Sequence, residues 1–369
     1  MKTVIAGGGT GGHLFPALAV AEVLRERGHE IVILISEKEI DALATRDRTE
    51  FHFEKMPGVG MPKIFSPQIF SFLKRMNESL SSCRALYRRF QPDVVLGMGG
   101  FTSTAPILAA RMRGVPSFIH ESNAIPGKAN KLNARIATGV LLGFGECAAF
   151  FPKSKCVVTG TPIRRSLGVR LPREQALTAF GLSSGRRTIL VMGGSQGAHG
   201  VNELMIQAAQ VLKQHPFQII HLAGRDDVQL VETNYRRADI PCHAAAFCHR
   251  MEEAYSAADV VVARSGAASL AELSHFAVPG ILIPYPNAAE DHQTLNAKIF
   301  ERAGAARVAV QSKTTPEGLA SAIVTLLDDE SLREKMSGAL RRLAPNAAAA
   351  RIADLLEAQT ADTEVLANA

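Results

Sequence analysis

The sequence predicts an α/β protein built from two Rossmann-type, doubly wound parallel sheets in series. Short, continuously apolar runs alternate with segments of helical period, which is the pattern of parallel strands covered on both faces. A strand, a glycine-rich turn and a helix stand at the start, and the same unit returns at 186–212. The 369 residues are enough for two domains of this kind.

In the first half we expect strands at 3–8, 30–36, 93–100, 115–122 and 139–144. The helix after the first strand covers 16–28, where Pro16 suits a first turn and Gly28 a C-cap. In the second half, strands are expected near 187–192 and at 217–224, 258–266 and 279–286. The join falls near 157–166, which gives domains 1–162 and 163–344. A helix within 345–369 is expected to pack back on the first domain.

The overall composition narrows the class of partner. A net charge of +6 favours anionic partners such as phosphates or an acidic membrane surface. Nucleic acid is not expected, because the chain has no tryptophan, few aromatic residues and no nucleic-acid-binding motif. We expect a cytoplasmic location for three reasons. The five cysteines lack the spacing of a disulfide framework, no secretory-signal pattern is present, and no apolar run reaches about 18 residues.

The opening motif GGGTGGH at 7–13 leads from a strand into a helix and contains G-x-G-x-x-G. Such a turn presents unpaired amides to phosphate, but it lacks the Lys-Ser/Thr of a nucleoside-triphosphatase loop. A dinucleotide is one interpretation, with Glu37 as its ribose ligand; the alternative is that Glu37 is a surface residue. His13 is either a general base beside the phosphate or a helix-start residue bound to a carbonyl.

Further polar clusters follow predicted strands. They are 120–123 (HESN), the RSG turn at 264–266 with Glu272 beyond it, and 291–296 (DHQTLN). Gly193, Gly194 and Gly197 repeat the first glycine turn, with His199 expected as a surface helix residue. Two glycine turns in series predict a ligand held between the domains, at the carboxyl ends of both sheets. The Cys242-His243 and Cys248-His249 pairs lack zinc-knuckle spacing, so no metal site is predicted.

Taken together, the motifs resemble one family over essentially the whole chain. In order they are GGGTGGH (7–13), GMGGF (97–101), HESNAIPG (120–127), GTPIR (160–164), GGSQGA (193–198), RSGA (264–267) and DHQTLNA (291–297). They are similar to those of the bacterial peptidoglycan N-acetylglucosaminyltransferases, the MurG family. Each motif is weak alone, whereas the ordered set is specific.

The resemblance implies a GT-B glycosyltransferase whose two Rossmann-like domains face a central cleft. It would move N-acetylglucosamine, with inversion, from its UDP carrier to the muramoyl 4-hydroxyl of undecaprenyl-diphosphoryl-muramoyl-pentapeptide (lipid I), giving lipid II. The second domain would hold the UDP-sugar and the first the lipid-linked acceptor. The implied enzyme needs no cofactor and no metal, and works peripherally at the cytoplasmic face of the bacterial inner membrane.

Site residues follow from the same resemblance. Ser195 and Arg164 would contact the UDP diphosphate, Glu272 the ribose, Ala267 and Ala268 the nucleotide, and Cys248 the uracil. His292, Gln293 and Asn123 would hold N-acetylglucosamine. Thr10, Gly11, Gly12 and His13 would face the acceptor diphosphate, with the first three also counted toward the UDP-sugar site. The base is either His13 or Glu121.

Three departures from the family pattern stand out. Ser122 replaces a glutamine, Phe101 replaces a common tyrosine, and FCHRM at 247–251 replaces a more acidic stretch. Ligand contacts that the family makes through the glutamine, the tyrosine hydroxyl or the acidic stretch are therefore not expected to be the same in this chain.

The lipid-linked acceptor requires access to a membrane. Residues 63–75 combine apolar side chains (Ile64, Phe65, Ile69, Phe70, Phe72 and Leu73) with basic ones (Lys63, Lys74 and Arg75). This pattern suits shallow insertion among anionic headgroups. The alternative is a helix whose apolar face belongs to the core of the first domain.

Three other functions remain open at this point. A UDP-N-acetylglucosamine 2-epimerase shares the expected architecture, and would act on the nucleotide sugar without acceptor. An NAD-dependent oxidoreductase fits the first glycine turn alone. A non-catalytic nucleotide-sensing protein that docks on membranes would need neither His13 nor Glu272.

Overall fold

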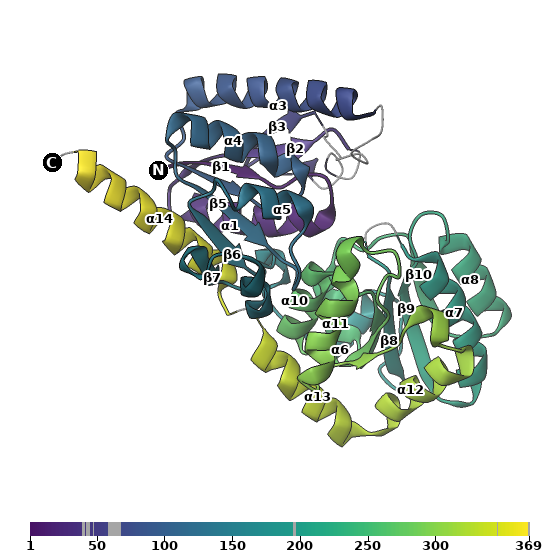
Figure 1. The fold of residues 1–369 in the computed structure, drawn as a ribbon. Coiled ribbons are helices and arrows are strands. Elements are labelled where there is room, and N and C mark those ends of the chain that lie inside the picture. Colours follow the sequence, from purple (N-terminus) through teal and green to yellow (C-terminus); the bar gives the residue numbers. More distant parts are fainter. Residues whose placement is uncertain are drawn as a thin grey trace. The chain divides into compact units, whose positions relative to one another are not determined.

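The computed structural model describes residues 1–38, 41, 45–46, 48–57, 68–194, 197–344 and 346–367. The chain forms two compact units (Figure 1). Met1–Arg165 and Pro345–Ala369 make the first, and Ser166–Ala344 makes the second. Each contains one all-parallel sheet with helices on it, so the predicted fold class of two Rossmann-like parallel-sheet domains is confirmed.

The first unit has a seven-stranded sheet in the order β3-β2-β1-β4-β5-β6-β7. Its strands are β1 (Lys2–Ala6), β2 (Glu30–Ser36), β3 (His52–Met56), β4 (Val94–Gly97), β5 (Ser117–Glu121), β6 (Gly139–Leu142) and β7 (Cys156–Val158). Strand order reverses direction between β1 and β4, which are paired. Ligands bind at such a switch point in open α/β sheets, beyond the carboxyl ends of the strands.

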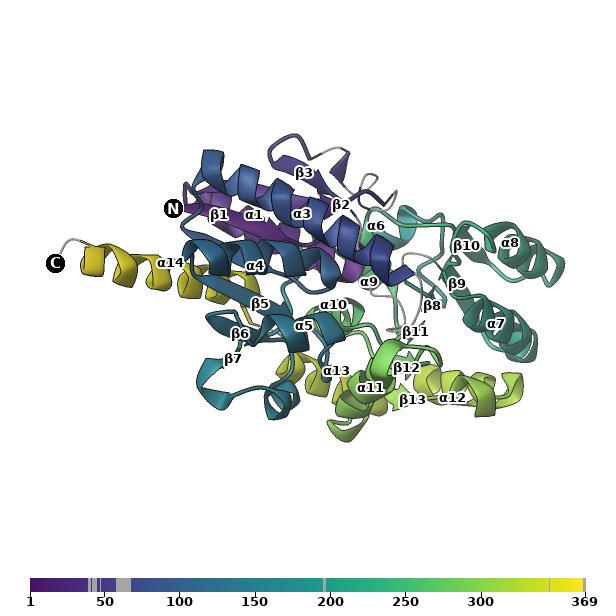
Figure 2. The same cartoon turned by 45° about the horizontal axis from the view of Figure 1, so that its top comes forward.

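Helices cover both faces of this sheet. They are α1 (Gly11–Glu26), α3 (Gln68–Phe90), α4 (Thr104–Arg113), α5 (Lys128–Asn133) and α14 (Ala348–Ala367). Successive β1 residues alternate between the faces: Val4 lies in the cluster that contains Tyr87 of α3, and Ile5 in the cluster that contains Leu18 of α1. On the first of these faces, α3 and α4 lie side by side (Figure 2).

The last helix, α14, packs on the first one, α1. Ile352, Ala353 and Leu356 are fully buried in the cluster formed by α1 and the sheet. At the end of α1, the guanidinium of Arg27 binds the carboxylates of Asp354 and Glu357, each at 2.7 Å. The first unit is thus built from both ends of the chain.

The second unit has a six-stranded sheet in the order β10-β9-β8-β11-β12-β13. Its strands are β8 (Arg187–Met192), β9 (Phe217–Leu222), β10 (Cys242–Ala245), β11 (Val260–Ala263), β12 (Gly280–Leu282) and β13 (Arg307–Val308). Its helices are α6 (Arg173–Thr178), α7 (His199–Val211), α8 (Val228–Arg237), α9 (Met251–Ala257), α10 (Ala267–Phe276), α11 (His292–Arg302), α12 (Pro316–Asp328) and α13 (Glu330–Leu343).

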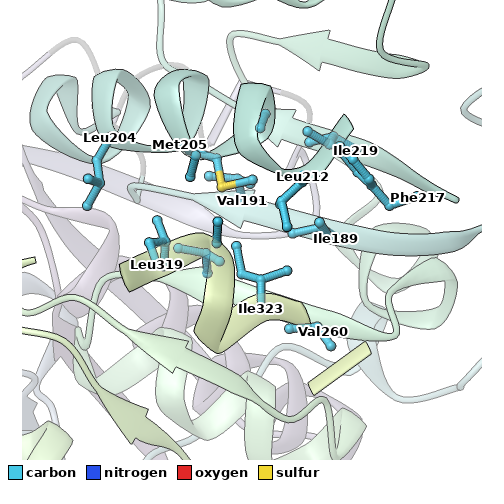
Figure 3. Packing of buried hydrophobic residues seen from close by; sticks show 14 of the residues in the cluster. Ile189, Val191, Leu204, Met205, Leu212, Phe217, Ile219, Val260, Leu319 and Ile323 are labelled. Atoms are coloured by element: carbon cyan, nitrogen blue, oxygen red, sulfur yellow. The ribbon is translucent and has the colours of Figure 1, made fainter. Parts of the chain in front are cut away.

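The core of the second unit lies between its sheet and the pair α7–α12 (Figure 3). Val191 of β8 and Val260 of β11 are fully buried there. Met205 of α7 and Ile323 of α12 close the layer from the helix side, and both are fully buried. Apolar burial of this extent is the main stabilising contribution to such a sheet.

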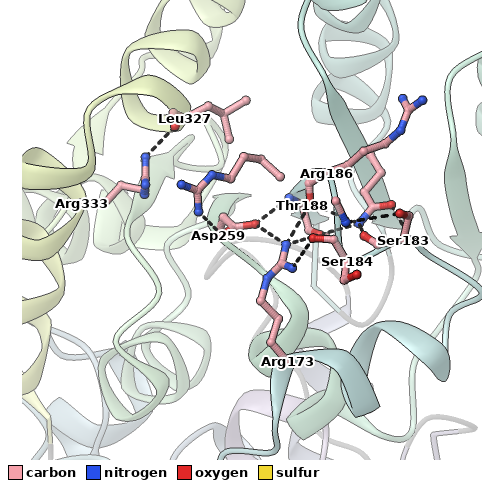
Figure 4. A network of polar contacts seen from close by, with 11 residues as sticks. Arg173, Ser183, Ser184, Arg186, Thr188, Asp259, Leu327 and Arg333 are labelled. Carbon is pink, nitrogen blue, oxygen red and sulfur yellow. Dashed lines mark hydrogen bonds and ion pairs between the residues drawn. The ribbon is translucent and has the colours of Figure 1, made fainter.

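A polar network around Asp259 ties the opposite, amino-terminal edge of this sheet (Figure 4). The carboxylate accepts a hydrogen bond from the backbone N–H of Thr188 at 2.8 Å. It also pairs with Arg173 of α6 at 2.8 Å and with Arg187 at 3.1 Å. Asp259 therefore fixes α6 to the starts of β8 and β11.

No helix in the described ranges combines the length and the apolar composition that a membrane span requires.

Candidate functional site

The first glycine turn lies between β1 and α1. Gly7 is so close to α1 that an added Cβ would overlap the Cβ of Ala17. Gly9 has a φ of +104°, which residues with side chains avoid. α1 begins at Gly11 with Thr10 as its N-cap. The first amides of α1 are therefore presented at the carboxyl end of β1, an arrangement that suits phosphate.

His13 stands in the first turn of α1 and is half-buried. Its Nδ1 is 3.2 Å from Oγ1 of Thr10. The imidazole packs on a second glycine turn, which follows β4: a Cβ on Gly99 would lie 3.0 Å from Nε2, and one on Gly100 would lie 3.2 Å from Cε1. Both glycines have positive φ. The motifs at 7–13 and 97–101 thus meet at the switch point of the first sheet.

Glu121 ends β5 and is only 4% exposed. Its Oε1 accepts hydrogen bonds from the backbone N–H of Asn123 at 3.0 Å and from the Asn123 side chain at 3.1 Å. Its Oε2 accepts from the N–H of Gly127 at 3.0 Å and from Nδ2 of Asn130 at 2.9 Å. Four donors surround this carboxylate and hold the loop between β5 and α5.

His120 is fully buried beside it. Nε2 donates to the carbonyl of Gly160 at 3.0 Å, so Nδ1 is an acceptor and receives the hydroxyl of Ser122 at 3.2 Å. Burial lowers the pKa of His120, which keeps the ring neutral. Ser122, the departure from the family pattern, therefore has an internal partner here.

Arg164 lies in the first unit, near the start of α1. Its guanidinium carbon is 4.1 Å from the centre of the Phe15 ring, a cation–π contact. The backbone N–H of Arg165 donates to Glu22 at 3.1 Å, and its guanidinium pairs with Glu26. Residues 164–165 are thus held along α1, and Arg164 lies against Phe15 of that helix.

The second unit carries its own glycine turn, between β8 and α7. A Cβ on Gly193 would lie 2.5 Å from the Cβ of Ala198. Gly197 has a φ of +78° and abuts the carbonyl of Ala223 beyond β9. These contacts leave no space for a side chain at position 193 or 197, which explains why both residues are glycine. Ser195, predicted to contact the UDP diphosphate, lies outside the described residues.

His199 begins α7 directly after this turn. Its Nδ1 is 3.0 Å from both carboxylate oxygens of Asp227, and its Nε2 is 3.3 Å from Glu203. The hydrogen bond to Asp227 raises the pKa of His199. Asp227 also accepts from Nδ2 of Asn202 at 2.7 Å. An exposed imidazole paired with Asp227 therefore stands beside the turn.

The turn at Ser265 and Gly266 leads from β11 into α10. α10 begins at Ala267, with Ala268 next, and among the described residues nothing lies within 4 Å of a Cβ placed on Gly266. This side of the turn therefore leaves room for a ligand. Glu272, one turn further along, is buried, and its Oε2 accepts the hydroxyl of Tyr255 at 2.7 Å.

α11 is joined to the same turn. Oε1 of Gln293 accepts from the N–H groups of Ser265 at 3.3 Å and Tyr285 at 3.0 Å. The Ser265 hydroxyl donates to the Gln293 carbonyl at 2.8 Å, and Asn296 donates to the Ser265 carbonyl at 3.1 Å. Nδ1 of His292 donates to the carbonyl of Ala289 at 2.6 Å. The clusters at 264–266 and 291–296 thus form one constellation.

The approach to α11 is strained. Glu290 and Asp291 have φ values of +54° and +53°, although neither is glycine. Consecutive left-handed residues of this kind cost free energy and gather at functional sites.

Cys248 follows β10 and is half-buried; burial raises the pKa of its thiol. The adjacent Phe247 is exposed and packs edge-on against His249, with ring centres 5.0 Å apart. Among the described residues, no three His, Cys, Asp or Glu side chains come together as metal ligands.

Sequence reasoning missed two members of the second-unit constellation. Tyr255 is a helix residue 17 positions before Glu272, and nothing in the local pattern links the two. Asn296 belongs to the predicted cluster 291–296 and lies four residues beyond His292, which is about one helical turn. That spacing is the signal that could have found it.

Two family models match the chain. The Glycosyltransferase family 28 N-terminal domain matches residues 3–142, and the Glycosyltransferase family 28 C-terminal domain matches residues 188–355. A relative from Halothermothrix orenii is 38% identical over 97% of this chain and 98% of its own. One from Geobacter sulfurreducens is 36% identical over 99% and 100%. Both are named UDP-N-acetylglucosamine–N-acetylmuramyl-(pentapeptide) pyrophosphoryl-undecaprenol N-acetylglucosamine transferase.

Among solved structures, the MurG of Acinetobacter baumannii is 31% identical, with a TM-score of 0.75 over 97% of this chain and 99% of that one. A UDP-GlcNAc 2-epimerase from Neisseria meningitidis has a TM-score of 0.71 over 96% and 99%, but only 15% identity, and so shares the fold alone. With relatives above 30% identity along nearly its full length, this chain belongs to the MurG family of glycosyltransferases.

Proposed function

We propose that this protein transfers N-acetylglucosamine from UDP-N-acetylglucosamine to the 4-hydroxyl of the muramoyl sugar in lipid I, giving lipid II with inversion at the anomeric carbon. The acceptor oxygen forms a bond to that carbon while the bond to the UDP β-phosphate oxygen breaks. The hydroxyl proton passes to a base and UDP leaves. The observation that carries the proposal is the seating of His13, between the first amides of α1 and the Gly99–Gly100 turn.

In this mechanism His13 is the base. Its ring is oriented by Thr10, 3.2 Å away, and lies beside amides that suit the acceptor diphosphate. Glu121 is the weaker candidate, because four hydrogen bonds already engage both of its oxygens. Its proposed part is to hold the loop that carries Asn123.

The second unit is the proposed UDP-sugar site. The open start of α10, at Ala267 and Ala268, receives the nucleotide, and Glu272 receives the ribose hydroxyls. Because Gln293 uses its carbonyl oxygen internally, its amide N–H2 is the group proposed for the sugar. His292 directs Nδ1–H to a carbonyl, which leaves Nε2 as the group for a sugar hydroxyl.

Departure of UDP requires stabilisation of the growing negative charge. The helix-start amides of α7 and α10 are proposed to supply it in part, and the Arg164 guanidinium is proposed to supply the rest. Cys248 is proposed to border the uracil.

Membrane attachment is proposed through the start of α3. Phe70 is 76% exposed and Leu73 is 55% exposed, and the adjoining Lys74 and Arg75 are exposed. The buried positions of α3 are Ser79, Cys83, Leu86 and Tyr87, all further along the helix. The remainder of the predicted patch, 63–67, lies outside the described residues. Exposed apolar and basic side chains at one end of a helix suit the headgroup region of an anionic cytoplasmic leaflet.

The test is radiolabel transfer from UDP-N-acetylglucosamine to a lipid I analogue by the purified protein. Formation of a lipid II analogue supports the proposal. Conversion of the nucleotide sugar to its manno epimer without acceptor would instead identify an epimerase, and an inert protein would contradict both.

A further inference from the structure

Asp41 is a buried acid that the mechanism above does not use. It lies beyond β2 in the first unit, and its side chain is fully buried. Its Oδ2 accepts three hydrogen bonds: from Oγ of Ser36 at 2.6 Å, from the N–H of Ser36 at 2.9 Å, and from the N–H of Gly9 at 2.7 Å. The last of these reaches into the first glycine turn.

The turn is shaped around this carboxylate. A Cβ on Gly8 would lie 2.7 Å from Oδ2 of Asp41, so only glycine permits the approach. The N–H of Gly9 points inward to Asp41 and is not available to a ligand. The amides of Gly11 and Gly12, at the start of α1, are those that a helix leaves for one. Asp41 therefore binds the amide of Gly9 from inside the protein, whereas the amides of Gly11 and Gly12 are the ones that would face a ligand.

Lys38 binds the other side of the same glycine. Its Nζ donates to the carbonyl of Gly9 at 3.0 Å, and its own N–H lies 3.3 Å from Oγ of Ser36. The side chain is exposed. The turn lacks a lysine of its own, so Lys38 brings a positive charge to the rim of a candidate phosphate site.

The burial of Asp41 has an energetic cost that its contacts with the turn must offset. A buried carboxylate costs several kcal/mol unless its oxygens are paired. Oδ1 of Asp41 is buried and accepts no hydrogen bond within the described residues. The three hydrogen bonds to Oδ2 offset part of this cost, and one of them fixes the N–H of Gly9.

We propose that Lys38 and Asp41 complete the acceptor-diphosphate site: Asp41 is the positioning residue of the first glycine turn, and Lys38 is a diphosphate-binding residue. This inference rests on the proposed function. The acceptor class is a lipid-linked diphosphate sugar, and Lys38 supplies its cationic contact from outside the turn.

The experiment measures KM for a lipid I analogue and for UDP-N-acetylglucosamine separately, with UDP affinity by calorimetry and Tm for each protein. The variants are Lys38→Met, Asp41→Ala and Asp41→Asn, the last of which retains an acceptor oxygen. Glu37→Gln, an exposed neighbour on the same segment, is the matched control.

Lys38→Met is expected to raise the acceptor KM about tenfold, with the UDP-sugar KM, UDP affinity and Tm unchanged. Asp41→Ala is expected to raise the acceptor KM and to lower kcat, each about tenfold, with UDP affinity intact. Asp41→Asn should fall between Asp41→Ala and wild type, and Glu37→Gln should match wild type.

An unchanged acceptor KM in Lys38→Met and Asp41→Asn, in a wild-type background that transfers sugar, would overturn this inference alone. So would equal changes in both KM values, or a fall in Tm as the only effect. A wild-type protein that makes no lipid II analogue would overturn the proposed function, and this inference with it.

Discussion

The imidazole of His13 rests on the backbone of Gly100, where an added methyl group would lie 3.2 Å from Cε1 and 3.3 Å from Nδ1. Gly100 has a φ of +70°. The glycines after β4 thus support the base proposed for the reaction.

Gly100→Ala is expected to lower kcat about 100-fold, because a displaced base loses its alignment with the acceptor hydroxyl. Gly114→Ala is a matched control: Gly114 also has a φ of +70°, but no described residue lies within 4 Å of its Cβ position. The control should lose about 1 kcal/mol of stability and little activity. Equal losses of kcat in the two variants would mean that backbone strain, and not the contact with His13, is responsible.

His13→Ala and Glu121→Gln separate the two candidate bases. His13→Ala should lower kcat at least about 100-fold while UDP affinity is retained. Glu121→Gln turns an amide N–H2 toward hydrogen-bond donors, so it should cost about 1–3 kcal/mol of stability and lower Tm, with kcat affected less than tenfold. Calorimetry and steady-state kinetics measure both. The assignment is reversed if Glu121→Gln folds normally and is inactive.

Glu272→Gln should raise the KM for UDP-N-acetylglucosamine about tenfold without changing the acceptor KM. Tyr255→Phe removes the hydroxyl that donates to Oε2 of Glu272, and its effect should be smaller and in the same direction. Glu301→Gln, on the exposed side of α11, serves as control. A normal UDP-sugar KM in Glu272→Gln would remove this residue from the site.

The stability of the second unit should depend on pH through His221. Its Nδ1 accepts the hydroxyl of Tyr235 at 2.9 Å and its Nε2 donates to Oδ1 of Asn202 at 3.0 Å. Burial lowers the pKa of His221 to about 3. The neutral ring is therefore favoured in the folded state, whereas the unfolded chain binds a proton below about pH 6.5.

The contribution of His221 is thus complete above about pH 6.5 and is lost as the pH falls toward 3, at up to about 1.4 kcal/mol per pH unit. His221→Gln should be less stable than wild type at pH 7, and the difference should shrink at pH 5 and again at pH 4. Urea unfolding at the three pH values measures it. A constant difference would show that His221 does not titrate between folded and unfolded states.

Charge reversal at the start of α3 tests membrane attachment. Lys74→Glu with Arg75→Glu should weaken partition onto vesicles containing phosphatidylglycerol by at least about tenfold, given about 1 kcal/mol per basic residue at the surface. Arg84→Glu with Arg88→Glu makes the same charge change on exposed positions further along the helix and should have little effect. Sedimentation with vesicles measures the partition. If both double variants lost vesicle binding equally, the binding would depend only on net charge and not on the start of α3.

The sequence predicts central parts of this fold better than its edges. β1, β2, β8 and β9 are mostly buried and rich in apolar residues because helices cover both of their faces, and that pattern is visible in the chain. The edge strands β3 and β7 do not show this apolar pattern. β3 reads HFEKM, with one buried residue in five, and β7 has three residues, none of them buried. Edge strands keep one side toward solvent, so their composition resembles that of loops.

For the site, spacing within a motif is visible in the sequence, whereas contacts between distant segments are not. The glycine turns could be predicted because each needs φ values or close approaches that only glycine permits. Glu37 was the candidate acid because it follows the second strand directly, yet the carboxylate that reaches the first turn belongs to Asp41. The path of the chain after β2 decides which acid turns inward, and no local pattern encodes that path.

The packing of α14 on α1, together with the ion pairs of Arg27, has a consequence for the synthesis of the chain on the ribosome. Arg27 and Asp354 are 327 positions apart, so a ribosome completes the entire second unit before the partner of Arg27 exists. Until then the face of α1 that receives Ile352 and Leu356 stays open. The first unit, although it starts first, is finished last, and a nascent chain must keep that apolar face from other contacts while the second unit is made.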